Sequence, residues 1–140
     1  MFVRSFQLAD YKAVTELFEE VLSESCYEET MKAFARQLKW DGELVLVAEV
    51  NSEIAGIIIG TIDNNKGYYY RIAVSKEHRG IGIGKALIEG MRSKFVSRKV
   101  SKILVSADQH NEQVLPLYES LGYQAGDFWR SLRPLSIVTG

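Results

Sequence analysis

The sequence is poor in the residues that build disulfide frameworks and metal sites. It contains one cysteine, Cys26, and two histidines, His78 and His110. A lone cysteine cannot form an internal disulfide, and the two histidines lack the close spacing of a helical metal-binding pair. These shortages exclude a disulfide-stapled domain and predict that the protein holds no metal ion.

Long apolar runs and an excess of one charge are also missing. The chain has 17 Lys and Arg residues against 18 Asp and Glu residues, for a net charge of −1. No run reaches the length of a transmembrane helix, and the first residues lack the apolar core of a signal peptide. We therefore expect a cytoplasmic protein that binds neither membranes nor nucleic acid. The length of 140 residues predicts one domain, 1–140.

What the chain does contain is a regular succession of strand and helix patterns. A helix with Asp10 at its start and a second helix ending near residue 41 should follow a first strand, with a connection at 23–27 between them. Three further strands form a meander, and a strand, helix, strand unit then places two strands in parallel. Pro116 restricts the last helix to a start two or three residues before it, and the tail at 123–138, interrupted by Pro134, should hold one or two final strands. The predicted strands are 2–6, 44–50, 54–62, 68–74 and 102–107, and the later helices begin near 83 and 111.

The most informative segment is residues 79–86, which read Arg-Gly-Ile-Gly-Ile-Gly-Lys-Ala. A glycine-rich turn from a strand into a helix exposes backbone N–H groups at the positive end of the helix dipole, which suits a phosphate. The segment fails the P-loop pattern at Arg79 and Ala86, and it fails the dinucleotide pattern at Lys85 and Leu87. The alternative is a tight turn that binds no ligand.

Two elements in register resemble the GNAT superfamily of acyl-CoA-dependent N-acetyltransferases. Arg79-x-x-Gly82-x-Gly84 matches the R/Q-x-x-G-x-G/A signature of that family. Asn111 and the run 117–123 (Leu-Tyr-Glu-Ser-Leu-Gly-Tyr) are similar to its downstream Asn and L-Y-x-x-x-G-F/Y element. The resemblance covers nearly the whole chain. It implies an α/β (α+β) fold, a mixed and mostly antiparallel twisted sheet with helices on both faces.

The resemblance also implies roles for named residues. Acetyl-CoA would be the co-substrate, and its acetyl group would pass directly to a primary amine in a ternary complex. Tyr118 would protonate the departing thiolate, and its alternative role is that of a packing residue. For Asn111 the alternative is a helix N-cap. For Arg79 and Lys85 the alternative is plain solvent exposure. The residues expected to bind the co-substrate are Ile72, Ala73, Val74, Arg79, Gly80, Ile81, Gly82, Ile83, Gly84, Lys85 and Asn111.

The acceptor and the general base stay open. Many members of the family carry a carboxylate on the strand before the glycine turn, but here that strand reads Tyr-Tyr-Tyr-Arg at 68–71. The three tyrosines either line the acceptor cleft or alternate between core and surface, and Cys26 is taken as incidental. The alternative functions are a non-catalytic acyl-CoA sensor and an enzyme with another acyl donor. The sequence is compatible with either a monomer or a homodimer. Candidate carboxylates are Glu24, Glu28, Glu29 and Asp108, with a solvated helix start as the other reading of the glutamates.

Overall fold

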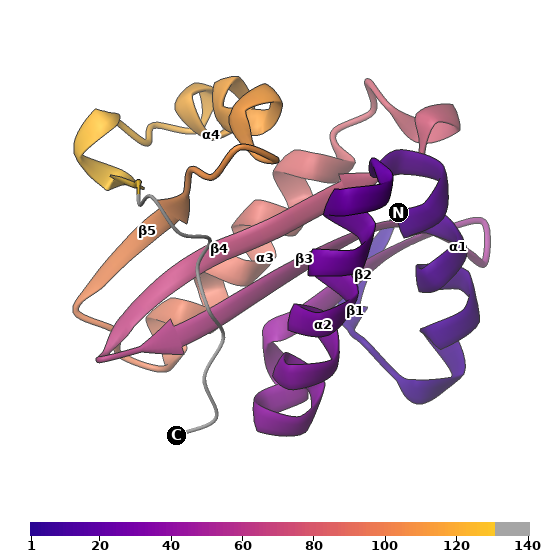
Figure 1. Ribbon diagram of the computed structural model, residues 1–140, viewed down its shortest axis with the longest axis horizontal. Coiled ribbons are helices and arrows are strands. Elements are labelled where there is room, and N and C mark those ends of the chain that lie inside the picture. The colour runs from indigo at the N-terminus through magenta and orange to yellow at the C-terminus, as the bar shows by residue number, and fades with distance from the viewer. Residues whose placement is uncertain (131–140) are drawn as a thin grey trace.

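The computed structural model describes residues 1–130, which form an open sheet of six strands between helices (Figure 1). The strand order follows the sequence, β1-β2-β3-β4-β5-β6. The strands are β1 (Phe2–Ser5), β2 (Val45–Val50), β3 (Glu53–Asp63), β4 (Lys66–Val74), β5 (Lys102–Ser106) and β6 (Phe128–Trp129). The α-helices are α1 (Tyr11–Val21), α2 (Glu24–Asp41), α3 (Ile83–Ser97) and α4 (Leu115–Ser120).

The sheet is antiparallel from β1 to β4 and parallel from β4 to β6. Tight turns at 51–52 and 64–65 join β2 to β3 and β3 to β4, and all four turn residues have positive φ angles. Asn tolerates this region better than other residues with a side chain, which explains three of the four residue choices. The predicted meander and the parallel pair joined by a helix are both confirmed.

Helices cover both faces of the sheet, as predicted from the family resemblance. Figure 1 shows α1 and α2 in front of the sheet and α3 behind it. Because side chains alternate along a strand, consecutive residues of β4 enter different cores: Tyr69 packs on the α3 side, while Tyr68 and Tyr70 pack on the side of α1 and α2. All three tyrosines are buried. An alternation between core and surface is therefore wrong, because neither face of the sheet is open at β4.

Three local expectations differ from the structure. Residues 24–27 belong to α2 rather than to a connection, because the Ser23 hydroxyl accepts a hydrogen bond from the Cys26 N–H and starts the helix there. Asp10 makes no side-chain cap on α1; its carboxylate accepts instead from the Gln7 N–H and from Arg4. The regular helix α4 begins at Leu115, one residue before the proline, after a 3₁₀ turn over Glu112–Val114.

In the tail, the structure contains the short strand β6, and the remainder of the predicted 123–138 segment lies outside the described residues. None of the helices within residues 1–130 combines the length and the apolar character needed to cross a membrane.

Candidate active site

The site forms where the parallel strands β4 and β5 separate. Their pairing runs from Lys66 opposite Lys102 to Tyr69 opposite Val105. Beyond that point β5 ends at Ser106, whereas β4 continues to Val74 with only β3 beside it. The second half of β4 therefore has an open edge on the β5 side.

Two side chains cap the ends of this open edge. The Asn111 Nδ2 group donates to the carbonyl oxygens of Tyr70 (2.8 Å) and Ser106 (2.6 Å), so it bridges the diverging strands. The Arg79 Nε group donates to the Val74 carbonyl at 3.3 Å. Backbone groups of alternate residues face the same side of a strand. Ile72, which lies between the two capped residues, therefore directs its N–H and C=O toward the opening, where the described part of the chain offers no strand partner.

The glycine-rich turn follows β4 after a 3₁₀ turn over Lys76–His78. Glycine is required in it for two different physical reasons. Gly80 and Gly82 have φ angles of +84° and +86°, and a side-chain carbon on either would meet no other atom within 4 Å. Their backbone conformation, not crowding, requires glycine. A Cβ on Gly84 would instead lie 2.8 Å from the Cδ2 atom of Leu117, so glycine allows α3 and α4 to approach closely.

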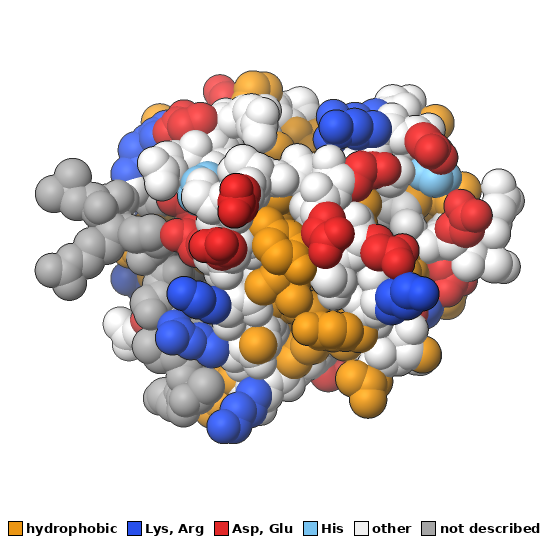
Figure 2. All heavy atoms as spheres, turned by 45° about the vertical axis from the view of Figure 1, so that its right-hand side comes forward, with side chains coloured by type: hydrophobic (Ala, Val, Ile, Leu, Met, Phe, Trp, Pro, Cys, Tyr) orange, Lys and Arg blue, Asp and Glu red, His pale blue; other side chains and the backbone are white. Residues whose placement is uncertain are grey.

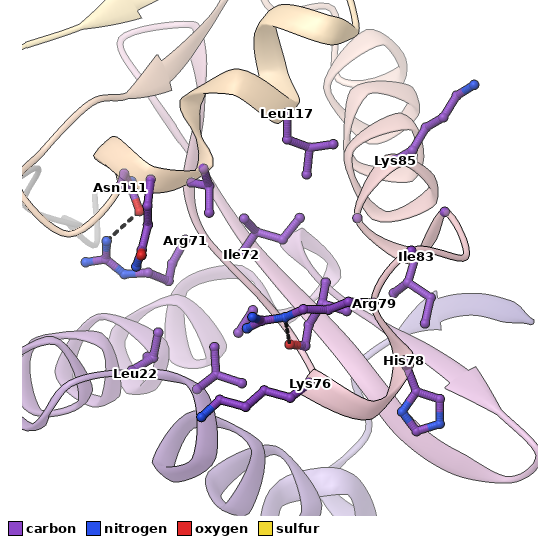
Figure 3. Close-up of a pocket in the computed structure, with 18 of the residues that line it drawn as sticks. Leu22, Arg71, Ile72, Lys76, His78, Arg79, Ile83, Lys85, Asn111 and Leu117 are labelled. Carbon is purple, nitrogen blue, oxygen red and sulfur yellow. Dashed lines mark hydrogen bonds between the residues drawn. The ribbon is translucent and has the colours of Figure 1, made fainter.

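Helix α3 begins at Ile83 with no side-chain cap from Gly82. The first N–H groups of a helix have no partner within the helix and lie at the positive end of its dipole. Lys76, Arg79 and Lys85 line the cavity that this helix start borders. Figure 3 shows Arg79 pointing back to β4 and the Lys85 side chain pointing outward. The local field therefore favours an anion.

A cavity of about 650 Å³ connects the helix start with the open edge of β4. Its wall also includes Val21 and Leu22 at the end of α1 and residues of the loop before α4. Figure 3 shows the space between Ile72, Leu117 and the start of α3. Of the residues predicted to bind the co-substrate, Ile81 alone is absent from the wall, and its side chain is exposed. The predicted residues that line the cavity are Ile72, Ala73, Val74, Arg79, Gly80, Gly82, Ile83, Gly84, Lys85 and Asn111.

Tyr118 lies behind the wall of this cavity rather than in it. Its ring packs against Tyr69 (5.2 Å between centroids) and Tyr123 (6.1 Å). Within residues 1–130 its hydroxyl makes no hydrogen bond, whereas the hydroxyls of Tyr69 and Tyr123 bond to each other. Burial raises the pKa of Tyr118 above that of an ordinary phenol, so the group stays protonated at neutral pH. The ring therefore packs among other aromatic rings, and its hydroxyl stays protonated.

The strongest polar feature of the site is Arg71 of β4, whose side chain is 1% exposed. Its five N–H groups are all used, by the Thr30 hydroxyl, Glu29, Asp108, the Asn111 Oδ1 atom and the Tyr70 hydroxyl. The Glu29 and Asp108 contacts measure 2.9 Å and 3.3 Å. The guanidinium carbon also lies 4.7 Å from the centre of the Tyr70 ring. We call these six residues the Arg71 cluster.

The Arg71 cluster answers several questions left open by the sequence. Asn111 occupies the N-cap position of the turn before α4, but its side chain makes no capping hydrogen bond and serves the cluster instead. Of the candidate carboxylates, Glu29 and Asp108 reach the site, whereas Glu24 and Glu28 are exposed on α2. Arg71 itself was missed, although a single cation inside a buried strand is a signal that could have identified it.

Comparisons with known proteins agree with this arrangement. Residues 11–123 match the model of the acetyltransferase (GNAT) family. An acetyltransferase of Pectobacterium atrosepticum is 35% identical over 127 residues, which cover 91% of this chain and 90% of that protein. The chain therefore belongs to the GNAT acetyltransferase family.

Solved structures show the same fold at low sequence identity. The aminoglycoside antibiotic 6'-N-acetyltransferase of Acinetobacter haemolyticus superposes with a TM-score of 0.72 at 18% identity and 97% coverage of both chains. The PaiA N-acetyltransferase of Thermoplasma acidophilum, solved in complex with coenzyme A, gives a TM-score of 0.70 at 18% identity, covering 88% of this chain and 89% of that one. These two likenesses concern the fold.

Proposed function

We propose that this protein is an N-acetyltransferase that moves an acetyl group from acetyl-CoA to a primary amine by direct attack in a ternary complex. The observation that carries the proposal is the single cavity in which the uncapped start of α3 meets the open edge of β4. Membership of the GNAT family supports an acyl-CoA donor, and a neighbour of the same fold binds coenzyme A.

The two parts of the cavity suit the two chemical parts of the donor. The pyrophosphate binds at the first N–H groups of α3, beside the positive side chains of Lys76, Arg79 and Lys85. The pantetheine arm is an extended chain with amide groups. It pairs with the free N–H and C=O of Ile72 as an added strand would. The open edge then places the thioester near the Arg71 cluster, at the far end of the cavity from the phosphates.

Acyl transfer at this point requires three events. The neutral amine nitrogen attacks the acetyl carbon, the carbon–sulfur bond breaks with its electron pair going to sulfur, and the thiolate takes a proton. Tyr118 matches the tyrosine of the family's L-Y-x-x-x-G-F/Y element, and on that resemblance we assign this proton to it. Burial keeps its phenol protonated at neutral pH. The nitrogen of the new amide then gives its extra proton to the Tyr118 phenolate, which becomes a phenol again.

A side rich in carboxylates favours a cationic acceptor. Between residues 13 and 31 the chain carries six glutamates and no lysine or arginine. In Figure 2, acidic side chains flank the upper part of a central apolar strip on both sides, and Lys and Arg side chains lie farther out. A protonated amine is attracted by such a field before it binds.

Calorimetric titration with acetyl-CoA and a thiol-release assay over a panel of primary amines test the proposal. The panel includes kanamycin, spermidine, Nα-acetyl-lysine methyl ester and a short peptide with a free N-terminus. We expect acetyl-CoA binding and release of CoA with at least one amine, with the acetylated product identified by mass spectrometry. Binding without turnover on any amine would favour a sensing module, and absence of acetyl-CoA binding would refute both functions.

A further inference from the structure

A second, smaller cavity adjoins the donor cavity on the acceptor side. Its volume is about 340 Å³, and it lies between the α1–α2 junction and the loop that precedes α4. It shares Leu22, His110 and Gln113 with the donor cavity, so the two spaces meet at these side chains. We call this second space the acceptor cleft. Its wall contains Leu22, Ser23 and Cys26 on one side and Gln109, His110, Glu112 and Gln113 on the other.

His110 stands at the junction of the two cavities and is held from two directions. Its backbone N–H donates to the Asp108 Oδ1 atom at 2.9 Å, which fixes the loop. Its Nε2 atom lies 3.8 Å from the Glu29 Oε2 atom, and the side chain is 14% exposed. Glu29 is held in turn by Arg71 at 2.9 Å. The imidazole therefore has a defined position and keeps access to solvent.

We propose that His110 is the general base of the reaction and that Glu29 positions the acceptor's ammonium group beside it. The inference rests on the proposed function, since it names the base for that same transfer. The separation of 3.8 Å exceeds a hydrogen bond, so Glu29 does not bond to the imidazole nitrogen. The nearer polar neighbour of that nitrogen is the exposed Gln109 side chain, at 3.5 Å. An ammonium nitrogen entering through the acceptor cleft can approach both groups at once. Imidazole is the side chain that most readily exchanges a proton near neutral pH.

The charges around this point favour a bound cation. Arg71 contributes one positive charge against the two carboxylates of Glu29 and Asp108, which leaves one negative charge in excess. The Asp108 side chain is 8% exposed, and its Oδ2 atom is buried with no hydrogen-bond partner in residues 1–130. Both carboxylates are already engaged by Arg71. The His110 Nε2 atom makes one long contact, to the Gln109 side-chain nitrogen at 3.5 Å. We therefore assign the proton transfer to the imidazole, since the two carboxylates are engaged by Arg71.

The proton steps balance as follows. The ammonium gives one proton to His110 and becomes a neutral amine, which forms the new carbon–nitrogen bond. The carbon–sulfur bond breaks, Tyr118 protonates the thiolate, and the second proton of the nitrogen returns to Tyr118. His110 finally releases its proton to water through the acceptor cleft, so the net reaction gives the amide, CoA thiol and one proton.

His110→Gln tests the proposal, because glutamine keeps a polar side chain but cannot act as a base near neutral pH. We expect kcat near pH 7 to fall about 10²–10⁴-fold, with little change in the KM for acetyl-CoA. The acidic limb of the kcat/KM profile should move from the neutral range to higher pH, where deprotonation of the free amine itself supplies the nucleophile. A merely structural role would lower activity without moving the limb. The charged and titratable groups that face His110 are Glu29 and Cys26 of α2, Arg71 of β4, and Asp108 and Glu112 of its own loop.

Two further variants serve as controls. His78→Gln removes the chain's other imidazole, at the donor end, and should keep the acidic limb whatever its effect on donor binding. Glu29→Gln should raise the KM for the amine and also keep the limb, since the base remains in place.

The outcomes separate the inference from the proposed function. Wild-type turnover with an unaltered His110→Gln profile overturns the inference alone. A wild-type kcat/KM that shows no ionisation between pH 5.5 and 8 overturns it as well, without the need for any variant. Acetyl-CoA binding with no turnover on kanamycin, spermidine, the lysine ester or the peptide overturns both.

Discussion

Replacing Arg71 by methionine should destabilise the protein far more than removal of a surface arginine. The side chain is 1% exposed and joins β4 to α2 and to the loop before α4. The substitution removes the guanidinium and leaves its five hydrogen-bond partners without their donor. Glu29 is 27% exposed and can turn toward water, but Asp108 is 8% exposed and is left as an uncompensated buried charge.

The expected loss follows from that difference in burial. Removing one partner of a buried ion pair costs about 3–5 kcal/mol, which is a large part of the stability of an ordinary domain. The matched control is Arg130→Met, whose ion pair with Glu112 joins side chains that are each 56% exposed. Exposed pairs contribute at most about 1 kcal/mol. The double variant Arg71→Met/Asp108→Asn should be more stable than Arg71→Met alone, because it no longer buries the unpaired carboxylate.

Urea unfolding followed by far-UV circular dichroism measures all four proteins under the same conditions. The expected order of stability is wild type and Arg130→Met together, then the double variant, then Arg71→Met. If Arg71→Met unfolded within about 1 kcal/mol of wild type, or if the double variant were the least stable, the Arg71 cluster would not have the energetic role described above.

Three other changes give separate predictions. Gly82→Ala forces a residue with a side chain to adopt a φ angle of +86°, so it should cost about 1–2 kcal/mol in unfolding free energy and weaken acetyl-CoA binding in calorimetry; unchanged affinity would argue against the phosphate site. Tyr118→Phe should lower turnover with little change in acetyl-CoA affinity, and wild-type turnover would remove Tyr118 from the mechanism. Hydrogen bonds from Arg4 hold the pKa of Asp10 below its usual range. The stability that this pair contributes is therefore complete above the unfolded pKa of about 3.9 and is lost as pH falls through the lower folded value. Asp10→Asn should be destabilised at pH 7 but match wild type in strong acid, and a pH-independent difference would contradict the assignment.

The local parts of the fold and of the donor site could be predicted from the sequence. The meander, the glycine turn and α3 depend on alternation, turn residues and helical spacing, which act over a few neighbours. The family prediction is confirmed by the match over residues 11–123. The roles of Tyr118 and of the co-substrate residues stay predictions, as does a cytoplasmic location.

The acceptor side could not be predicted, because its contacts join segments far apart in the chain. Arg71 reaches Glu29 across 42 positions and Asn111 across 40. Sequence patterns place Arg71 on a strand but cannot say which carboxylates meet it. For the same reason, the sequence does not show that His110 lies beside Glu29 of α2. Asn111 shows the same limit. Its position in the sequence fits a local helix cap, but its side chain bonds to the distant Arg71 instead.

The open edge of β4 also raises the question of whether a strand from another chain can pair there. Unpaired strand edges invite a second strand and lead to aggregation. Here Asn111 and Arg79 occupy the carbonyls of Tyr70 and Val74, on either side of Ile72, so few acceptors remain for a second strand. A foreign strand needs several consecutive hydrogen bonds to hold its register, and an edge with two of its carbonyls occupied supplies few of them. A thin flexible ligand needs fewer such contacts, so this edge is better suited to a ligand than to a foreign strand.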